Sequence, residues 1–121
     1  MNLTKADRSF SEYIRRRDAI NGYVKCCTCP VVDNWKSMDC GHLEKRGNLS
    51  VRWDERNAAV QCQYCNRHND GEYDKMKAYL INRFGAEAIN EVIHLAKQDI
   101  KLMQFEIDEI ENKYKSKISQ L

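Results

Sequence analysis

The sequence predicts a small α+β domain that is stabilised by a metal ion and flanked by helices at both ends. Three observations support this fold class: two C-x-x-C pairs, short strand-like segments between them, and amphipathic helical patterns before and after them. The chain has 121 residues and 42% hydrophobic content, which suits one domain with a modest core. A metal site would add stability that so small an apolar core lacks.

Composition excludes several classes of protein. Six cysteines are compatible with a secreted disulfide scaffold, but the N-terminal residues are polar and do not resemble a signal peptide. We therefore expect a reducing, intracellular setting. No run of about 18 apolar residues is present, so we expect no membrane span. The net charge of +2 is too small to identify a polyanionic partner by itself.

The N-terminal segment predicts a helix over residues 4–20. Thr4 and Asp7 have the spacing of a capping box, and Phe10 and Ile14 follow at helical spacing before an Asn-Gly turn ends the pattern. The capping residues would satisfy main-chain N–H groups at the helix start, and the two apolar residues would face the core.

The middle of the chain predicts short extended segments over 34–39, 51–53 and 58–61, which together form a hairpin-like unit. A turn is expected at 69–71, where the sequence reads Asn-Asp-Gly. A helical stretch follows and stops at Gly85, and its apolar face carries Met76, Leu80 and Phe84.

Residues 86–121 keep apolar side chains at alternating steps of four and three: Ile89, Ile93, Ala96, Ile100, Met103, Ile107, Ile110, Tyr114 and Leu121. This repeat favours one long, coiled-coil-like helix. Its apolar seam can join a second chain in a homodimer, fold back on the N-terminal helix, or lie on its own domain. We divide the chain into a metal-stabilised domain over 1–85 and this helix over 86–121.

The two C-x-x-C pairs supply the four thiolates of a zinc site: Cys26, Cys29, Cys62 and Cys65. Each pair forms a tight turn that presents two sulfurs to one ion at about 2.3 Å. Four thiolates leave no open coordination position, so this zinc is expected to be structural rather than catalytic. Cys27 is an alternative to Cys26 at a poorer spacing, and otherwise Cys27 and Cys40 are expected to be free, partly buried thiols.

Several motifs stand around the cysteine pairs in a fixed order: Phe10-Ser11-Glu12-Tyr13-Ile14-Arg15, Asp39-Cys40-Gly41-His42, Arg52-Trp53-Asp54-Glu55-Arg56-Asn57 and Gln61-Cys62-Gln63-Tyr64-Cys65-Asn66-Arg67. In these motifs the chain resembles the HNH, or ββα-metal, nucleases, and within them the phage NinG (Rap) recombination endonuclease family. The resemblance covers most of residues 4–85. It implies a zinc-stabilised ββα-metal nuclease domain that needs a second divalent cation for activity.

The resemblance also implies roles for single residues. His42 matches the general base that deprotonates the attacking water. Asp39 and Asn66 match positions that bind the catalytic Mg²⁺ or Mn²⁺ through oxygen atoms, and His68 is a rival ligand. Asn57 matches the catalytic-motif residue that ties the loop between the strands and holds the base in position. Alone, each Asn would be explained equally well by ordinary turn chemistry.

Cationic side chains near these motifs are candidates for contacts with DNA phosphates. The candidate residues are Lys45, Arg46, Arg52, Arg67, Arg15 and Arg16. A solvated charged surface is the alternative explanation, because acidic residues stand among them. None of the candidates has a pattern typical of base readout, which favours recognition of DNA shape over sequence.

The sequence and the resemblance together predict a DNA endonuclease that acts on branched recombination intermediates, such as Holliday junctions or D-loops. A homodimer through the C-terminal helix would place two sites on one substrate, and the setting would be the cytoplasm of a bacterial host. One alternative is a non-catalytic, zinc-stabilised DNA-binding or adaptor protein. Another is a sequence-specific homing or restriction nuclease of the HNH type.

Overall fold

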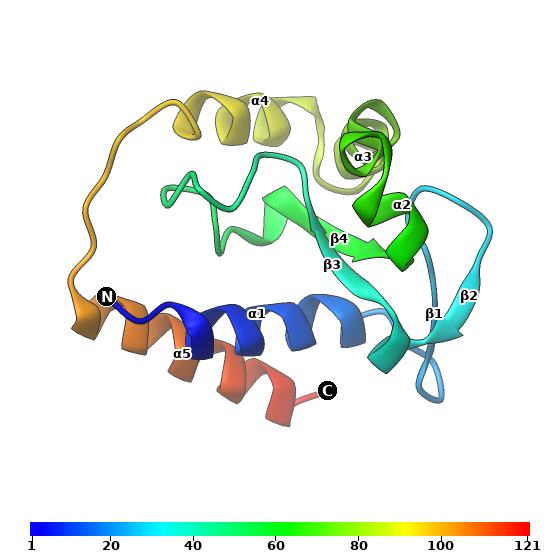
Figure 1. Ribbon diagram of the computed structural model, residues 1–121, viewed down its shortest axis with the longest axis horizontal. Coiled ribbons are helices and arrows are strands. Elements are labelled where there is room, and N and C mark those ends of the chain that lie inside the picture. The colour runs from blue at the N-terminus through cyan, green and yellow to red at the C-terminus, as the bar shows by residue number, and fades with distance from the viewer.

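A computed structural model describes all residues, 1–121, and confirms a small α+β fold with five α-helices and two small hairpin sheets (Figure 1). None of these helices has the length and apolar character that a membrane span requires. In chain order the elements are α1 (Thr4–Arg16), β1 (Tyr23–Lys25), β2 (Val32–Asn34), the 3-10 turn η1 (Trp35–Ser37), β3 (Asp39–His42), the 3-10 turn η2 (Glu55–Asn57), β4 (Ala58–Gln61), α2 (Gln63–Arg67), α3 (Asn69–Phe84), α4 (Ala86–Leu95) and α5 (Gln104–Ser119).

The β3–β4 hairpin forms the middle layer of the molecule. The strands pair antiparallel, with Asp39 opposite Gln61. Side chains alternate across the hairpin, so Ala58 packs into the cluster around Phe10 of α1, while Ala59 packs into the cluster around Met76 of α3. The hairpin therefore separates a lower layer of α1 and α5 from an upper layer of α3 and α4 (Figure 1).

Helix α1 begins at the predicted residue, but not for the predicted reason. Leu3 occupies the N-cap position and makes no side-chain hydrogen bond to the helix, so the capping-box prediction is wrong. The Asp7 side chain turns away from the helix start and accepts hydrogen bonds from Arg52 and Trp53. The predicted apolar face is confirmed, because Phe10 and Ile14 are buried.

The strand predictions are partly wrong. The segment 58–61 is confirmed as β4, but 34–39 divides into a 3-10 turn and the start of β3. The division has a local cause, because the Asn34 side chain accepts a hydrogen bond from the Lys36 N–H at 3.0 Å and thereby caps the turn. Residues 51–53 form turns rather than a strand.

The turn at 69–71 has left-handed backbone, as the Asn-Asp-Gly sequence predicts, and the apolar face of α3 is buried at Met76 and Leu80. Gly85 ends α3 with φ of +94°. The turn lets the chain reverse direction after α2, so that α3 returns across the β3–β4 hairpin (Figure 1).

One long C-terminal helix was predicted, and this prediction is wrong. The segment forms two helices, α4 and α5, joined by residues 96–103. The apolar repeat packs against two different surfaces of the same chain. Ile89 packs against α3, whereas Ile107 and Tyr114 pack against α1. Met103, which would continue a single seam, is 64% exposed.

Helices α1 and α5 lie side by side and run in the same direction (Figure 1). At one end Gln104 exchanges hydrogen bonds with Asn2, and further along the Tyr13 and Tyr114 rings lie 5.5 Å apart. For the second half of the seam, this arrangement confirms the alternative in which it folds back on the N-terminal helix, whereas the first half packs against α3. It also joins the C-terminal segment 86–121 to the core of residues 1–85, while the homodimer stays a prediction.

We predict that the close packing at the centre of the β3–β4 hairpin requires glycine at position 41. A Cβ atom at this position would lie 2.0 Å from Gln61 Oε1 and 2.8 Å from Met76 Cε, so Gly41→Ala forces buried neighbours to move. We expect a loss of about 1–3 kcal/mol in the free energy of unfolding, measured by chemical denaturation. The matched control is Gly47→Ala, whose Cβ meets no atom within 4 Å. Equal stability of the two variants would contradict the close packing.

Candidate functional site

The four predicted zinc ligands lie together. The sulfur atoms of Cys26, Cys29, Cys62 and Cys65 are all within 4.8 Å of one another, and the Cys29 and Cys62 sulfurs are 3.6 Å apart. Tetrahedral zinc with bonds of about 2.3 Å sets its ligand sulfurs about 3.8 Å apart. All six cysteines are free thiols, so no disulfide competes for these atoms. The sequence prediction of a four-cysteine cluster able to hold one metal ion is confirmed.

Main-chain N–H groups point at the cluster sulfurs, as expected of C-x-x-C turns that bind metal. Cys26 Sγ accepts a hydrogen bond from Thr28 N, and Cys62 Sγ accepts one from Cys65 N, each at 3.5 Å. Such bonds stabilise thiolates relative to thiols. The soft, closed donor set suits zinc and leaves no coordination position for substrate, as in structural zinc sites.

The two remaining cysteines lie outside the cluster. Cys27 contacts the Met76 sulfur at 3.8 Å, and burial raises the pKa of its thiol, so Cys26 and not Cys27 belongs to the group of four. Cys40 lies beside the α1 core, where burial raises its pKa to about 12. Both thiols therefore stay protonated and act as small apolar side chains.

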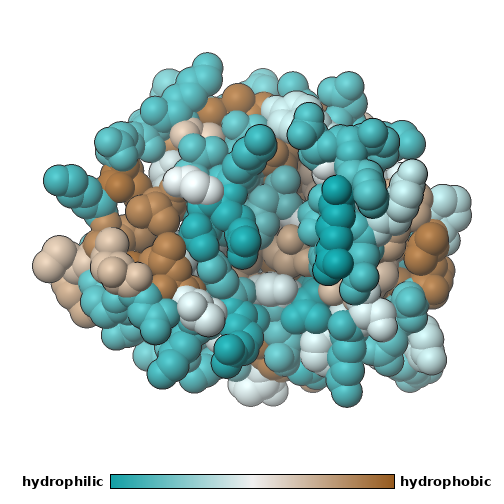
Figure 2. All heavy atoms as spheres, in the orientation of Figure 1, coloured by the Kyte–Doolittle hydropathy of each residue, from teal (hydrophilic) through white to brown (hydrophobic).

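A polar cleft of about 830 Å³ lies beside the cysteine cluster. Its walls come from α1, β3, the loop after β3, and α2. Three predicted site residues, Asp39, His42 and Asn66, line this one cleft. Asn66 directly follows the cluster residue Cys65, so the four-cysteine cluster and the cleft share helix α2. Hydrophilic side chains gather over the middle of the face drawn in Figure 2.

His42 is held in one orientation by the loop that follows its strand. Its Nε2 atom lies 3.0 Å from the main-chain oxygen of Arg52. A carbonyl oxygen only accepts hydrogen bonds, so Nε2 of the neutral ring carries the proton and Nδ1 is left with a free lone pair. Burial lowers the pKa of His42 below its ordinary value, and the charges of Arg46 and Arg52 lower it further. The ring is therefore neutral near pH 7 and able to accept a proton.

Asp39 and Asn66 lie in direct contact. The Asn66 amide donates to Asp39 Oδ2 at 2.9 Å, and Arg67 donates to both carboxylate oxygens of Asp39 at 3.0 and 3.3 Å. A carboxylate and an amide carbonyl are hard donors that suit Mg²⁺ or Mn²⁺ rather than zinc. His68 points elsewhere, because its ring lies 4.7 Å from that of Tyr64 and is absent from the cleft lining.

Asn57 is fully buried and ties the loop between β3 and β4. Its Nδ2 donates to the carbonyls of Glu44 at 3.0 Å and Val51 at 3.1 Å, while its Oδ1 accepts from Glu44 N at 2.8 Å. These three bonds satisfy every polar atom that the side chain can use toward the main chain. Asn57 lines no part of the cleft, but its main-chain oxygen accepts a hydrogen bond from Leu43 N, directly after His42, at 2.8 Å.

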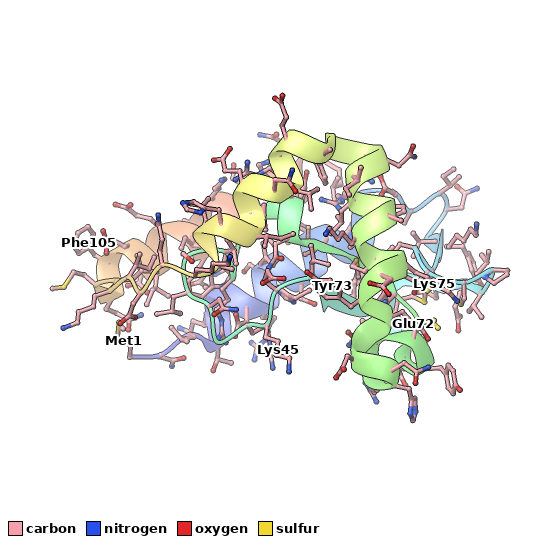
Figure 3. The ribbon with its side chains drawn as sticks, turned by 90° about the horizontal axis from the view of Figure 1, so that it is seen from above. Met1, Lys45, Glu72, Tyr73, Lys75 and Phe105 are labelled. Carbon is pink, nitrogen blue, oxygen red and sulfur yellow. The ribbon has the colours of Figure 1, made fainter.

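The predicted cationic residues divide into two groups. Arg15, Lys45, Arg46 and Arg67 line the cleft, and Figure 3 shows Lys45 projecting from its loop into solvent. Arg16 lies outside, where it pairs with Glu12 at 2.9 Å and covers the Trp35 ring. Arg52 also lies outside the cleft lining, because its side chain is only 14% exposed and its guanidinium pairs with Asp7 at 2.6 Å. We therefore do not retain Arg16 and Arg52 among the phosphate contacts.

The cleft also contains residues that the sequence analysis did not select, among them Asp7, Ser11, Lys36, Gln63 and Asp70. A signal for part of this set exists in the sequence. Asp7, Ser11 and Arg15 recur every four residues, so they share one polar face of α1 beside the buried Phe10. That periodicity indicates a helix face turned toward a polar site.

Taken together, these features define a small α+β protein with a four-cysteine centre able to hold a structural metal ion, next to a polar cleft. The family model described as "Bacteriophage Lambda NinG protein" matches residues 3–121. The chain therefore belongs to the NinG family of phage proteins.

Curated relatives agree with this assignment. The chain is 32% identical over 91 residues to "Protein ninG" of Escherichia phage 933W and of Enterobacteria phage VT2-Sa, and 30% identical over 91 residues to "Protein ninG" of Escherichia phage lambda. Each match covers 74% of this chain and 43% of the relative, so the matched region is less than half of the relatives' length. No solved structure matches.

The cysteine cluster predicts one zinc ion per chain that is needed for folding. Cys26→Ser should lose the metal and unfold at a lower temperature, because three thiolates bind zinc more weakly than four. Elemental analysis together with thermal denaturation measures both effects. The matched control is the neighbouring Cys27→Ser, which should keep one equivalent of zinc because its sulfur lies outside the cluster. Loss of zinc from the control alone would contradict the ligand assignment.

Proposed function

We propose that this chain is a divalent-metal-dependent DNA endonuclease of the HNH, or ββα-metal, type. The observation that carries the proposal is the single cleft that His42, Asp39 and Asn66 line together. The order of elements supports it as well, since the hairpin β3–β4 is followed directly by α2, with His42 on the first strand and Asn66 on the helix. A base, two oxygen donors and surrounding cations are the parts that phosphodiester hydrolysis needs.

In the proposed reaction, Nδ1 of His42 accepts a proton from a water molecule as the water oxygen attacks the phosphorus atom. The bond to the 3′ oxygen breaks on the opposite side and that oxygen takes a proton from a solvent water, which leaves 5′-phosphate and 3′-hydroxyl ends. Asp39 and Asn66 would hold Mg²⁺ or Mn²⁺, which neutralises charge on the phosphate and the leaving oxygen. Cation binding requires Arg67 to release the Asp39 carboxylate, so that Arg67 becomes free to contact a phosphate.

The substrate proposed for this site is branched DNA of the kind formed in recombination. Support comes from the NinG family resemblance and from the polar, cation-rich cleft, which offers phosphate contacts and no base-reading element. A homodimer through α5 would have to use the outer face of that helix, because Ile107 and Tyr114 face α1. Phe105 at the start of α5 and Leu121 after its end are exposed large apolar residues.

The proposed base predicts that His42→Ala abolishes cleavage, with a fall of at least about 100-fold in rate, while zinc content and fold stay intact. The assay is a gel that compares a four-way junction with linear duplex, with and without Mg²⁺. His94→Ala is the matched control, because His94 is exposed on α4 and far along the chain from the cleft. His68→Ala tests the rival ligand and should leave activity unchanged.

Binding of branched DNA by the wild-type protein without metal-dependent cleavage would instead support the non-catalytic adaptor. Discrete cuts in linear duplex would support a sequence-specific nuclease. Retained cleavage in His42→Ala would refute the assigned base while leaving the four-cysteine centre unaffected.

The cationic rim predicts a salt-dependent contribution to DNA binding. Lys45→Ala should weaken binding uniformly across DNA sequences and reduce the slope of log affinity against log salt by about 1, because one phosphate contact is lost. Fluorescence anisotropy over a salt series measures the slope. Lys97→Ala, an exposed lysine after α4, is the control and should leave the slope unchanged. An unchanged slope for Lys45→Ala would remove it from the interface.

A further inference from the structure

Asp7 of α1 is the partly buried end of a hydrogen-bond network that reaches His42. One carboxylate oxygen accepts from Arg52 Nε at 2.9 Å and from Trp53 Nε1 at 3.0 Å, and the other accepts from Arg52 Nη2 at 2.6 Å. The side chains of Asp7 and Arg52 are 22% and 14% exposed. Charge-assisted bonds of this geometry in a partly buried position hold both partners firmly.

Arg52 and Trp53, the two residues that donate to Asp7, are joined by one peptide unit. That unit carries the Arg52 main-chain oxygen, which lies 3.0 Å from His42 Nε2. Its own main-chain support is weak, since Trp53 N makes no main-chain hydrogen bond and Arg52 N, in the preceding peptide unit, reaches the Leu49 carbonyl only at 3.4 Å. The Arg52 guanidinium adds a bond to the Arg46 carbonyl at 2.7 Å, which folds the loop over the same place. The side-chain contacts with Asp7 are therefore the main restraint on the direction of this carbonyl.

We propose that Asp7 is a positioning residue for His42: by clamping the Arg52–Trp53 peptide unit, it directs the carbonyl that keeps the proton on Nε2 and leaves Nδ1 free to act as the base. The proposal rests on the proposed nuclease function for its catalytic meaning. The geometric part, which concerns the tautomer of His42, stands without it. Asp7 touches neither the substrate nor the cation in this scheme, and acts only through Arg52 and Trp53.

The test substitutes Asp7→Asn, which keeps the size of the side chain but removes the charge and one acceptor for the Arg52 fork. The matched control is Asp18→Asn, because Asp18 forms a comparable pair with Arg83 at 2.6 and 3.3 Å, outside the cleft lining. Both variants lose one arginine–carboxylate pair. Only Asp7→Asn should affect His42.

The first measurement is the nitrogen NMR spectrum of the histidine rings in the zinc-loaded protein at a pH of about 8, where neutral imidazoles show which nitrogen carries the proton. Wild type and Asp18→Asn should show His42 protonated on Nε2. Asp7→Asn should show a mixture of the two tautomers. A pure Nε2–H signal in Asp7→Asn, or an equal mixture in Asp18→Asn, overturns the proposal.

The second measurement is the single-turnover rate of junction cleavage with protein in excess. Asp7→Asn should lower this rate on the order of 10- to 100-fold with unchanged DNA affinity, because the base is misaligned while the phosphate contacts remain. An unchanged rate overturns the catalytic part. An inactive wild-type protein would count against the proposed nuclease, whereas the NMR comparison would still decide the role of Asp7.

If the Asp7→Asn protein does not fold, the Trp53→Phe variant is used for the same test. This variant keeps an aromatic ring in the α1–α5 cluster and removes only the hydrogen bond from Nε1 to Asp7. We expect a smaller tautomer change in the same direction. A folded Trp53→Phe protein with the wild-type histidine spectrum would contradict the clamp.

Discussion

The four-cysteine cluster is the constraint on which the geometry of the cleft depends. It joins the segment after β1 to the start of α2, and its buried cysteines pack in one small apolar cluster with Val24, Met38 and Val60. Because Asn66 directly follows the ligand Cys65, a metal ion at the cluster sets the position of the Asn66 side chain relative to Asp39 on β3. The four-cysteine cluster and the proposed catalytic cation site are thus coupled through a single turn of helix.

Two buried amide side chains also hold segments around the cleft together. Asn57 satisfies its amide with main-chain groups and fixes the loop after β3, whereas Gln61 links Thr28 in the cysteine turn to the Gly71 carbonyl at the start of α3. The Gln61 Oε1 atom is buried without a partner. A buried oxygen without a hydrogen-bond partner costs free energy. The close packing of the Gln61 side chain against Gly41 holds this oxygen in place despite that cost.

Local sequence signals predicted much of the fold. The apolar spacing of Phe10 and Ile14, the β4 segment and the Asn-Asp-Gly turn all identify elements whose conformation depends on nearby residues. The apolar repeat after Gly85 led to the wrong prediction of one long helix. A spacing of three and four residues indicates which side of a helix is apolar, but not whether one surface or two surfaces will cover that side. Here α3 covers the first part and α1 covers the second.

The candidate site likewise has a part that the sequence predicted and a part that only the tertiary structure decided. Residue types and spacing predicted the four thiolates, because each C-x-x-C turn places two sulfurs close enough to share one ion, and the motif resemblance selected Asp39, His42 and Asn66. Tertiary structure alone decided which cations face the cleft and that Asp7, remote in sequence, holds the loop beside His42. The physical reason is range: turn and helix signals act within a few residues, whereas an ion pair forms wherever packing brings two charges together.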